Sequence, residues 1–140
     1  MKNIIVKVFI LSALVGLSAR NVFSQKPKKT ETVAINGVEI YYEVYGYGAP
    51  FLILHGWTQS SASWKNLVPL FSSQYELYLV DLRGHGKSSP LTDDFSIQLA
   101  SNDLLTLVDQ LGLEQINAIG ISFGGMVLLQ LENLPEGLRT

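Results

Sequence analysis

The sequence predicts an α/β fold, with a mostly parallel sheet covered by helices on both faces. Three observations support this. Continuous apolar runs, typical of strands buried on both faces, recur along the chain. An amphipathic helical segment separates two of them, as in a right-handed crossover between parallel strands. Turns rich in glycine and polar residues follow the runs, at the strand ends where α/β sheets carry their chemistry.

Composition bounds the possible functions. Of the 140 residues, 47% are apolar and 16% are charged, which fits a packed core and excludes a disordered tail. The absence of cysteine excludes disulfides, zinc-thiolate sites and a cysteine nucleophile. From Gln25 onward, 7 basic residues face 12 acidic ones, so we expect no nucleic-acid partner.

Residues 1–24 predict a signal peptide. Lys2 and Lys7 precede the apolar run Val8–Leu17, which is about half the length of a membrane span. The small residue Ser24 favours cleavage before Gln25, and a site near residue 19 is a poorer alternative. We therefore expect an exported protein, periplasmic or extracellular, without stable membrane anchoring after cleavage.

Two other interpretations of this run fit less well. An uncleaved membrane anchor would have to extend backward through Lys7. A buried helix of a soluble domain fits less well still, since the run is apolar on all faces.

A hairpin is the first element expected after the leader. Residues 25–31 predict a polar, unstructured lead-in, and the domain proper is expected to cover residues 32–140. Asn36-Gly37 separates the strand segments 33–35 and 38–45, and this dipeptide accepts the positive φ angles of a type I′ turn.

The remaining elements alternate between strand and helix. The apolar runs at 50–54, 74–80 and 115–119 predict three parallel strands. A short helix is expected over 64–71 and a longer one over 96–111, where apolar residues recur at three- and four-residue spacing. Ser96 is its expected N-cap, and Gly112 its expected end.

The turn after the strand at 115–119 carries the pattern G-x-S-x-G, from Gly120 to Gly124. A serine in a strained strand-to-helix turn needs neighbours without side chains two positions away, so that the chain bends sharply and the hydroxyl stays exposed. The alternative is a glycine-rich turn with an incidental serine. Because an apolar strand precedes the turn and an apolar helix follows it, we interpret Ser122 as a nucleophile.

The turn after Leu54 begins with His55 and Gly56. A backbone N–H in this turn, together with that of Phe123, could stabilise the negative charge of a tetrahedral intermediate. His55 is a candidate catalytic base. Its position at a strand end, directly before glycine, instead favours a structural role in fixing the loop by hydrogen bonds.

The turn after Val80 holds Asp81, Arg83 and His85 before Gly86-Lys87-Ser88. A phosphate-binding loop would require a glycine five positions before Gly86, where Asp81 stands, so nucleotide binding is excluded. A metal site of Asp81, His85 and His55 would lack a dense ligand set. We expect Asp81 to pair with Arg83 and brace the loop.

Together, the segments His55–Trp57, Asp81–Ser88 and Gly120–Gly125 resemble those of the α/β-hydrolase superfamily, among its esterases, lactonases and cofactor-free haloperoxidase-like members. The resemblance covers about residue 30 to the end. It implies Ser122 as nucleophile, the backbone amides of Trp57 and Phe123 as the oxyanion hole, and a small-molecule acyl substrate. No cofactor or metal is implied. Epoxide hydrolases and haloalkane dehalogenases of the superfamily use an aspartate nucleophile instead.

In this superfamily the triad acid and histidine follow the nucleophile along the chain. The 18 residues after Ser122 contain two glutamates, Glu132 and Glu136, and no histidine. We therefore expect the chain to be the N-terminal part of a hydrolase, inactive alone, with residues 115–119 as an unpaired edge strand. The alternative is an inactive binding module with this fold, or a truncated pseudogene product.

Overall fold

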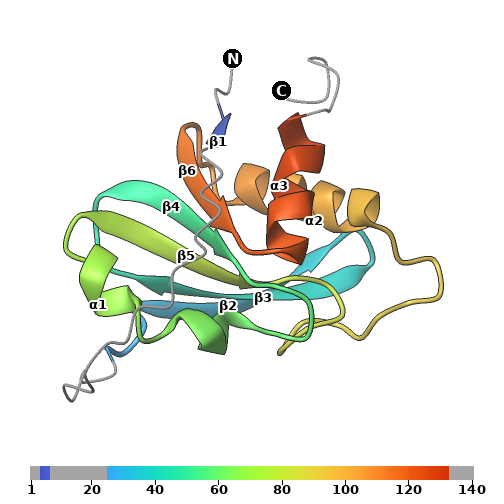
Figure 1. Ribbon diagram of the computed structural model, residues 1–140, viewed down its shortest axis with the longest axis horizontal. Helices are drawn as coiled ribbons and strands as arrows, with labels where there is room; N and C mark the ends of the chain where they lie inside the picture. Colours follow the sequence, from blue (N-terminus) through green and yellow to red (C-terminus); the bar gives the residue numbers. More distant parts are fainter. Residues whose placement is uncertain (1–3, 7–24, 133–140) are drawn as a thin grey trace.

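The computed structural model describes residues 4–6 and 25–132, and its central feature is a six-stranded sheet (Figure 1). The strand order is β1-β6-β4-β5-β3-β2. The predicted α/β class is confirmed. The strands are β1 (Ile4–Val6), β2 (Lys29–Ile35), β3 (Val38–Tyr45), β4 (Ala49–Leu54), β5 (Tyr75–Asp81) and β6 (Ile116–Gly120), and the helices are the 3₁₀-helix η1 (Ser61–Trp64), α1 (Val68–Phe71), α2 (Ile97–Gln110) and α3 (Phe123–Glu132).

The centre of the sheet is parallel, and its register aligns the strand ends. Strand β4 lies between β5 and β6, so the chain crosses to one side of β4 and then to the other. Leu54, the last residue of β4, is paired with Val80 of β5 and with Gly120 of β6. The loops that follow the three strands therefore meet at one edge, at the switch point where α/β sheets bind ligands.

The predicted hairpin is confirmed. Strands β2 and β3 are antiparallel, and Asn36 and Gly37 have φ angles of 48° and 82°, as a type I′ turn requires. The lead-in predicted over residues 25–31 is shorter, because β2 already begins at Lys29. The N–H of Lys28 donates to the Val44 carbonyl at 2.7 Å, which holds the chain on the sheet before the strand starts.

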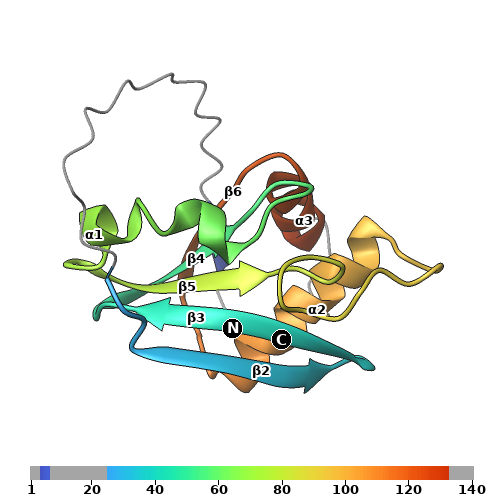
Figure 2. The ribbon, with the colours of Figure 1, turned by 90° about the horizontal axis from the view of Figure 1, so that it is seen from below.

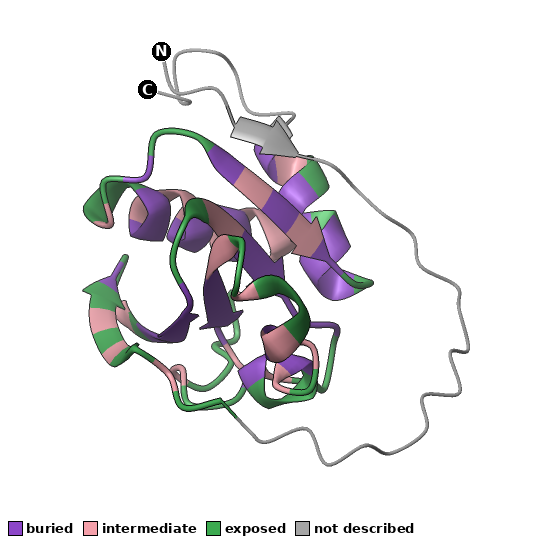
Figure 3. Cartoon of the chain, turned by 90° about the vertical axis from the view of Figure 1, so that its left-hand side faces the viewer, coloured by how far each residue is buried: buried purple, intermediate pink, exposed green. Residues whose placement is uncertain are grey.

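Helices cover the two faces unequally (Figures 1 and 2). Helices α2 and α3 pack with alternate residues of the strands into the larger core, which includes Leu54, Val80 and Phe123. The smaller core on the other face combines η1 and α1 with residues such as Ile53 and Leu79. Figure 3 shows that burial decreases from the central strands toward β2, which is exposed at the edge of the sheet.

The two predicted helices fare differently. The helix expected over residues 64–71 is wrong as a single element, because η1 ends at Trp64 and α1 begins at Val68 with proline in its first turn. Proline has no N–H, so Pro69 cannot donate the hydrogen bond to the Lys65 carbonyl that one continuous helix would need, whereas a proline is tolerated in the first turn of α1. The longer helix is confirmed: the Ser96 hydroxyl accepts from the Leu99 N–H at 3.1 Å, and Gly112 has the positive φ of a helix end.

The edge of β6 is not unpaired, in contrast to the prediction. Strand β1 pairs with it in parallel, with Ile4 opposite Ile116. An unpaired strand presents a row of free N–H and C=O groups, which any extended segment can satisfy. The rest of the predicted signal peptide lies outside the described residues. Within the described residues, no helix is long and apolar enough to span a bilayer.

Candidate active site

The loops after β4 and β6 are joined directly by backbone hydrogen bonds. The N–H of Ile121 donates to the Leu54 carbonyl at 3.2 Å, and the N–H of Gly124 donates to the His55 carbonyl at 3.1 Å. The first turn of α3 is therefore fixed against the turn that contains Trp57. This contact brings together the three residues predicted to act on substrate, Ser122, Trp57 and Phe123.

Ser122 occupies the sharp turn between β6 and α3. Its φ angle is 49°, in the left-handed region that costs a residue with a side chain about 1–2 kcal/mol. The residue is exposed, whereas Phe123 beside it is buried. Within the described residues, the hydroxyl of Ser122 has no hydrogen-bond partner. The turn thus presents a strained, accessible serine at the N-terminus of a helix.

The two glycines flanking Ser122 are required by close backbone contact. A Cβ atom on Gly120 would lie 2.4 Å from the carbonyl carbon of Gly124. A Cβ atom on Gly124 would lie 2.7 Å from the His55 carbonyl oxygen and 2.8 Å from that of Leu54. The G-x-S-x-G spacing therefore lets strand, turn and helix approach closely enough to form the bend.

His55 is buried and uses both ring nitrogens in the scaffold. Its Nε2 accepts a hydrogen bond from the Leu82 N–H at 3.0 Å, so the ring proton is on Nδ1, which donates to the Gly56 carbonyl at 2.8 Å. Burial lowers the pKa of His55, and the hydrogen bond to Gly56 opposes this shift only in part. The geometry agrees with the predicted structural role and leaves no ring nitrogen free to act as a base.

The orientation of the peptide group between Gly56 and Trp57 is fixed by hydrogen bonds to the Gly56 carbonyl. In addition to the His55 ring, the Gln59 N–H donates to the Gly56 carbonyl at 3.2 Å, while the Gln59 side chain accepts from the Gly56 N–H at 3.0 Å. In a trans peptide the N–H of Trp57 points opposite to that carbonyl. Among the described residues, the N–H groups of Trp57 and Phe123 have no acceptor.

The predicted pairing of Asp81 with Arg83 is wrong. Asp81 accepts hydrogen bonds from two backbone N–H groups, of Ser61 at 2.6 Å and of Lys87 at 2.9 Å. It therefore braces the loop through the main chain and also holds the start of η1. With both carboxylate oxygens occupied in this way, Asp81 does not need a cationic side chain as its partner.

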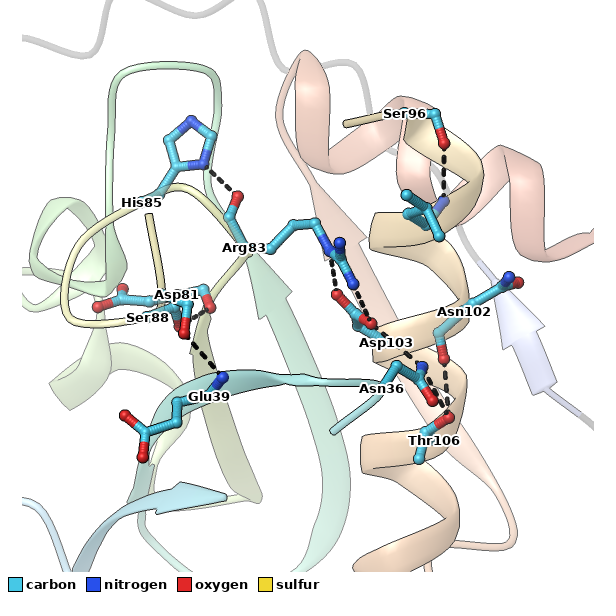
Figure 4. A network of polar contacts seen from close by, with 12 residues as sticks. Asn36, Glu39, Asp81, Arg83, His85, Ser88, Ser96, Asn102, Asp103 and Thr106 are labelled. Carbon is cyan, nitrogen blue, oxygen red and sulfur yellow. Dashed lines mark hydrogen bonds and ion pairs between the residues drawn. The ribbon is translucent and has the colours of Figure 1, made fainter. Parts of the chain in front are cut away.

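Arg83 instead reaches helix α2, where it forms a two-pronged ion pair with Asp103 at 2.5 and 2.7 Å (Figure 4). Both side chains are buried, and the pairing raises the pKa of Arg83. Asn36 of the hairpin also donates to Asp103, at 3.1 Å. Asp103 thus connects the loop after β5, helix α2 and the β2–β3 turn into one polar network.

Four aromatic rings pack together beside the turn of Ser122, from the loop after β4, the connection between β5 and α2, and the first residue of α3. Trp57 packs edge-on against His85, Phe95 and Phe123, with ring centroids 4.9, 5.5 and 5.1 Å away. His85 stacks on Phe123 at 5.4 Å, and its Nδ1 hydrogen-bonds to the Arg83 carbonyl at 3.0 Å. We call these four residues the aromatic cluster. It fixes the position of the Trp57 side chain relative to the serine turn.

Sequence reasoning missed three contributors to this region. Phe95 lies just before α2 and Asp103 lies within it, and the apolar periodicity of this segment gave no indication that either reaches the loops. Glu43, on strand β3, is buried and paired with Lys65 at 3.1 Å. A glutamate between apolar residues in a predicted strand is the one signal that could have indicated a buried ion pair. Within the described residues, no group of three or more metal-ligating side chains is present.

A sequence profile of the alpha/beta hydrolase fold matches residues 49–132, more than half of the chain. The chain belongs to this family. Residues of this α/β-hydrolase chain are 37% identical over 93 positions to a soluble epoxide hydrolase from Corynebacterium sp.. They are 33% identical over 106 positions to a pimeloyl-[acyl-carrier protein] methyl ester esterase from Aeromonas hydrophila, and 33% identical over 91 positions to the non-heme chloroperoxidase CPO-A1 from Kitasatospora aureofaciens.

These matches cover 66%, 74% and 64% of the α/β-hydrolase chain, but only 32%, 40% and 33% of the respective relatives. The chain thus spans roughly a third of their length. Among solved structures, the epoxide hydrolase CorEH superposes with a TM-score of 0.69 at 33% identity, covering 73% of this chain and 36% of that one. The epoxide hydrolase VrEH1 from Vigna radiata also gives 0.69, at 29% identity, covering 74% and 34%.

Proposed function

We propose that the protein is a serine hydrolase acting on carboxylic esters, lactones or related acyl compounds, with Ser122 as nucleophile. The observation that carries the proposal is the strained, exposed position of Ser122 between two glycines that have no room for a side chain. Strain of this kind is found at functional sites.

The reaction follows from the positions of three groups. The Ser122 oxygen attacks the carbonyl carbon, and the carbonyl π electrons move to its oxygen as the new C–O bond forms. The N–H groups of Trp57 and Phe123 stabilise this oxyanion, and the N-terminal end of α3 adds a favourable dipole. The alcohol then leaves with the proton taken from Ser122, and water releases the acid from the acyl-enzyme.

A base must take the proton from Ser122, and the described residues do not supply it. Both nitrogens of His55 are engaged, and His85 is held in the aromatic cluster by stacking and by its bond to Arg83. We place the acid and histidine of the triad outside these residues, in the order that the family's motif implies.

The names of the relatives do not select one activity, since they include epoxide hydrolases, a chloroperoxidase and a methyl ester esterase. Among these activities, a serine nucleophile favours ester hydrolysis. A serine forms an acyl ester that water hydrolyses, whereas the epoxide hydrolases of the superfamily use an aspartate. Serine at position 122 therefore supports acyl transfer.

Labelling with a fluorophosphonate tests the proposal in the complete gene product. We expect stoichiometric labelling of the protein, loss of labelling in Ser122→Ala, and unchanged labelling in Ser60→Ala. Ser60 is the matched control because its side chain makes no capping hydrogen bond to η1. Labelling that persists in Ser122→Ala would refute the nucleophile. A folded protein that neither reacts nor hydrolyses esters would support the alternative, an inactive binding module.

A further inference from the structure

The side chain of Trp57 is unusually exposed for a residue so firmly packed. It is 45% exposed, although large aromatic residues are mostly buried, and three rings contact it at interplanar angles of 60–88°. The other ring closest to the serine turn, Phe123, is 1% exposed. Trp57 is thus a fixed apolar wall beside the site rather than a mobile surface residue.

Three charged side chains at the end of β5 and in the loop after it are engaged with other parts of the fold. Asp81 binds backbone N–H groups, Arg83 pairs with Asp103, and the ammonium group of Lys87 lies 3.1 Å from the Tyr41 hydroxyl on strand β3. The side chains that the serine turn exposes are apolar, namely Ile121 before Ser122 and Met126 one helical turn after it. Asp93 and Asp94, just before Phe95, are exposed carboxylates, so an anionic substrate group at this position would meet acidic side chains and no unengaged Arg83 or Lys87.

We propose that Trp57 determines specificity, selecting substrates whose carbonyl carries an uncharged, apolar substituent. This rests on the proposed function, because the same residue would supply an oxyanion N–H and so lie beside the carbonyl. Burying an apolar group against the Trp57 ring is favourable because it removes apolar surface from water. A carboxylate there would lose hydration without gaining a partner.

Equilibrium binding to the complete protein carrying Ser122→Ala tests this without turnover. The probes are a neutral alkyl methyl ketone and two analogues of equal length, one ending in a carboxylate and one in a trimethylammonium group. We expect the neutral ketone to bind about tenfold more tightly than either charged probe, because a charged end placed against the Trp57 ring loses hydration.

Variants of Trp57 then identify the residue responsible. Trp57→Ala should remove most of the preference for the neutral ketone, and Trp57→Phe should retain part of it because a ring remains in the aromatic cluster. Tyr47→Ala is the matched control, since Tyr47 is an aromatic residue that is 73% exposed and lies before β4, at the opposite end of that strand from Trp57. It should change nothing.

Two results would overturn the inference: equal affinity for the three probes, or a Trp57→Ala protein as selective as its parent. Tighter binding of the trimethylammonium probe would also overturn it, because a tryptophan face can attract cations. These outcomes are separate from failure of the proposed function. If fluorophosphonate labelling misses Ser122 while neutral ketones still bind through Trp57, the nucleophile is wrong and the specificity stands.

Discussion

The Nε2 atom of His55 accepts a hydrogen bond of 3.0 Å from the backbone N–H of Leu82. This contact joins the end of strand β4 to the end of β5, the two strands whose loops flank Ser122. On its other side the ring holds the Gly56 carbonyl. His55 thereby sets the orientation of the peptide group whose N–H, from Trp57, is proposed to bind the oxyanion.

Replacing this histidine should destabilise the fold without removing the nucleophile. His55→Ala leaves the buried N–H of Leu82 without an acceptor, so we expect a loss of about 1–3 kcal/mol in the free energy of unfolding. Urea denaturation measures this loss. Ser122 should still react with a fluorophosphonate, more slowly. A folded His55→Ala protein that no longer reacts at all would identify His55 as the base instead.

Stability should also depend on pH through His55. Burial lowers its pKa in the folded protein, below the ordinary value of 6.5, so the unfolded chain binds the proton more tightly. The contribution of His55 is therefore complete above about pH 6.5 and is lost as the pH falls toward its folded pKa. Urea denaturation measured from about pH 5 to about pH 8, on both sides of the ordinary histidine pKa of about 6.5, should show this decline in the free energy of unfolding. In His55→Ala the decline should be smaller, and an unchanged decline would contradict the assignment.

The close contact at Gly124 predicts that Gly124→Ala lowers the free energy of unfolding, the opposite of what helix propensity alone predicts. Alanine normally stabilises a helix by about 1 kcal/mol relative to glycine. In Gly124→Ala, however, the new methyl group would lie 2.7 Å from the His55 carbonyl oxygen, and overpacking of this kind destabilises by about 1–3 kcal/mol.

A matched control for Gly124 is Gly112→Ala at the end of α2. A Cβ there meets no atom within 4 Å, so the left-handed backbone, at about 1–2 kcal/mol, is the only cost, without the added steric contact found at Gly124. Urea unfolding should show the larger loss for Gly124→Ala, together with loss of labelling at Ser122. A Gly124→Ala protein more stable than its parent would mean that helix and strand are not in contact at this point.

Export gives a prediction that depends on the leader alone. Because Lys2 and Lys7 precede a short apolar run, and small residues follow it, we expect the mature chain to begin between Arg20 and Lys26 and therefore to lack β1. Mass spectrometry of the N-terminal peptide from exported protein measures this directly. Intact Met1 in a soluble cytoplasmic pool would contradict it.

The sequence predicted most of the fold because its patterns are local. The Asn36-Gly37 turn, the apolar strands and the Ser96 cap each depend on residues within a few positions. The sequence did not predict ion pairs between residues that lie far apart along the chain. Arg83, in the loop after β5, pairs with Asp103 on helix α2 rather than with neighbouring Asp81. Glu43 is buried because Lys65 and two tyrosines surround it.

In the candidate site, too, features set by neighbouring residues could be predicted, and features set by distant contacts could not. The position of Ser122 followed from the G-x-S-x-G spacing, since the reason for the glycines is local crowding. The exposure of Trp57 and its contact with Phe95 could not be predicted, because they arise where loops from separate strands converge.

Trapping the covalent intermediate tests the central claim most directly. The complete gene product is mixed with a neutral ester, quenched in acid during turnover and digested, and the peptides are analysed by mass spectrometry. We predict that the mass of the acyl group appears on the peptide containing Ser122 and is absent from Ser122→Ala. An acyl group on any other residue, or ester turnover that persists in Ser122→Ala, would contradict the proposal.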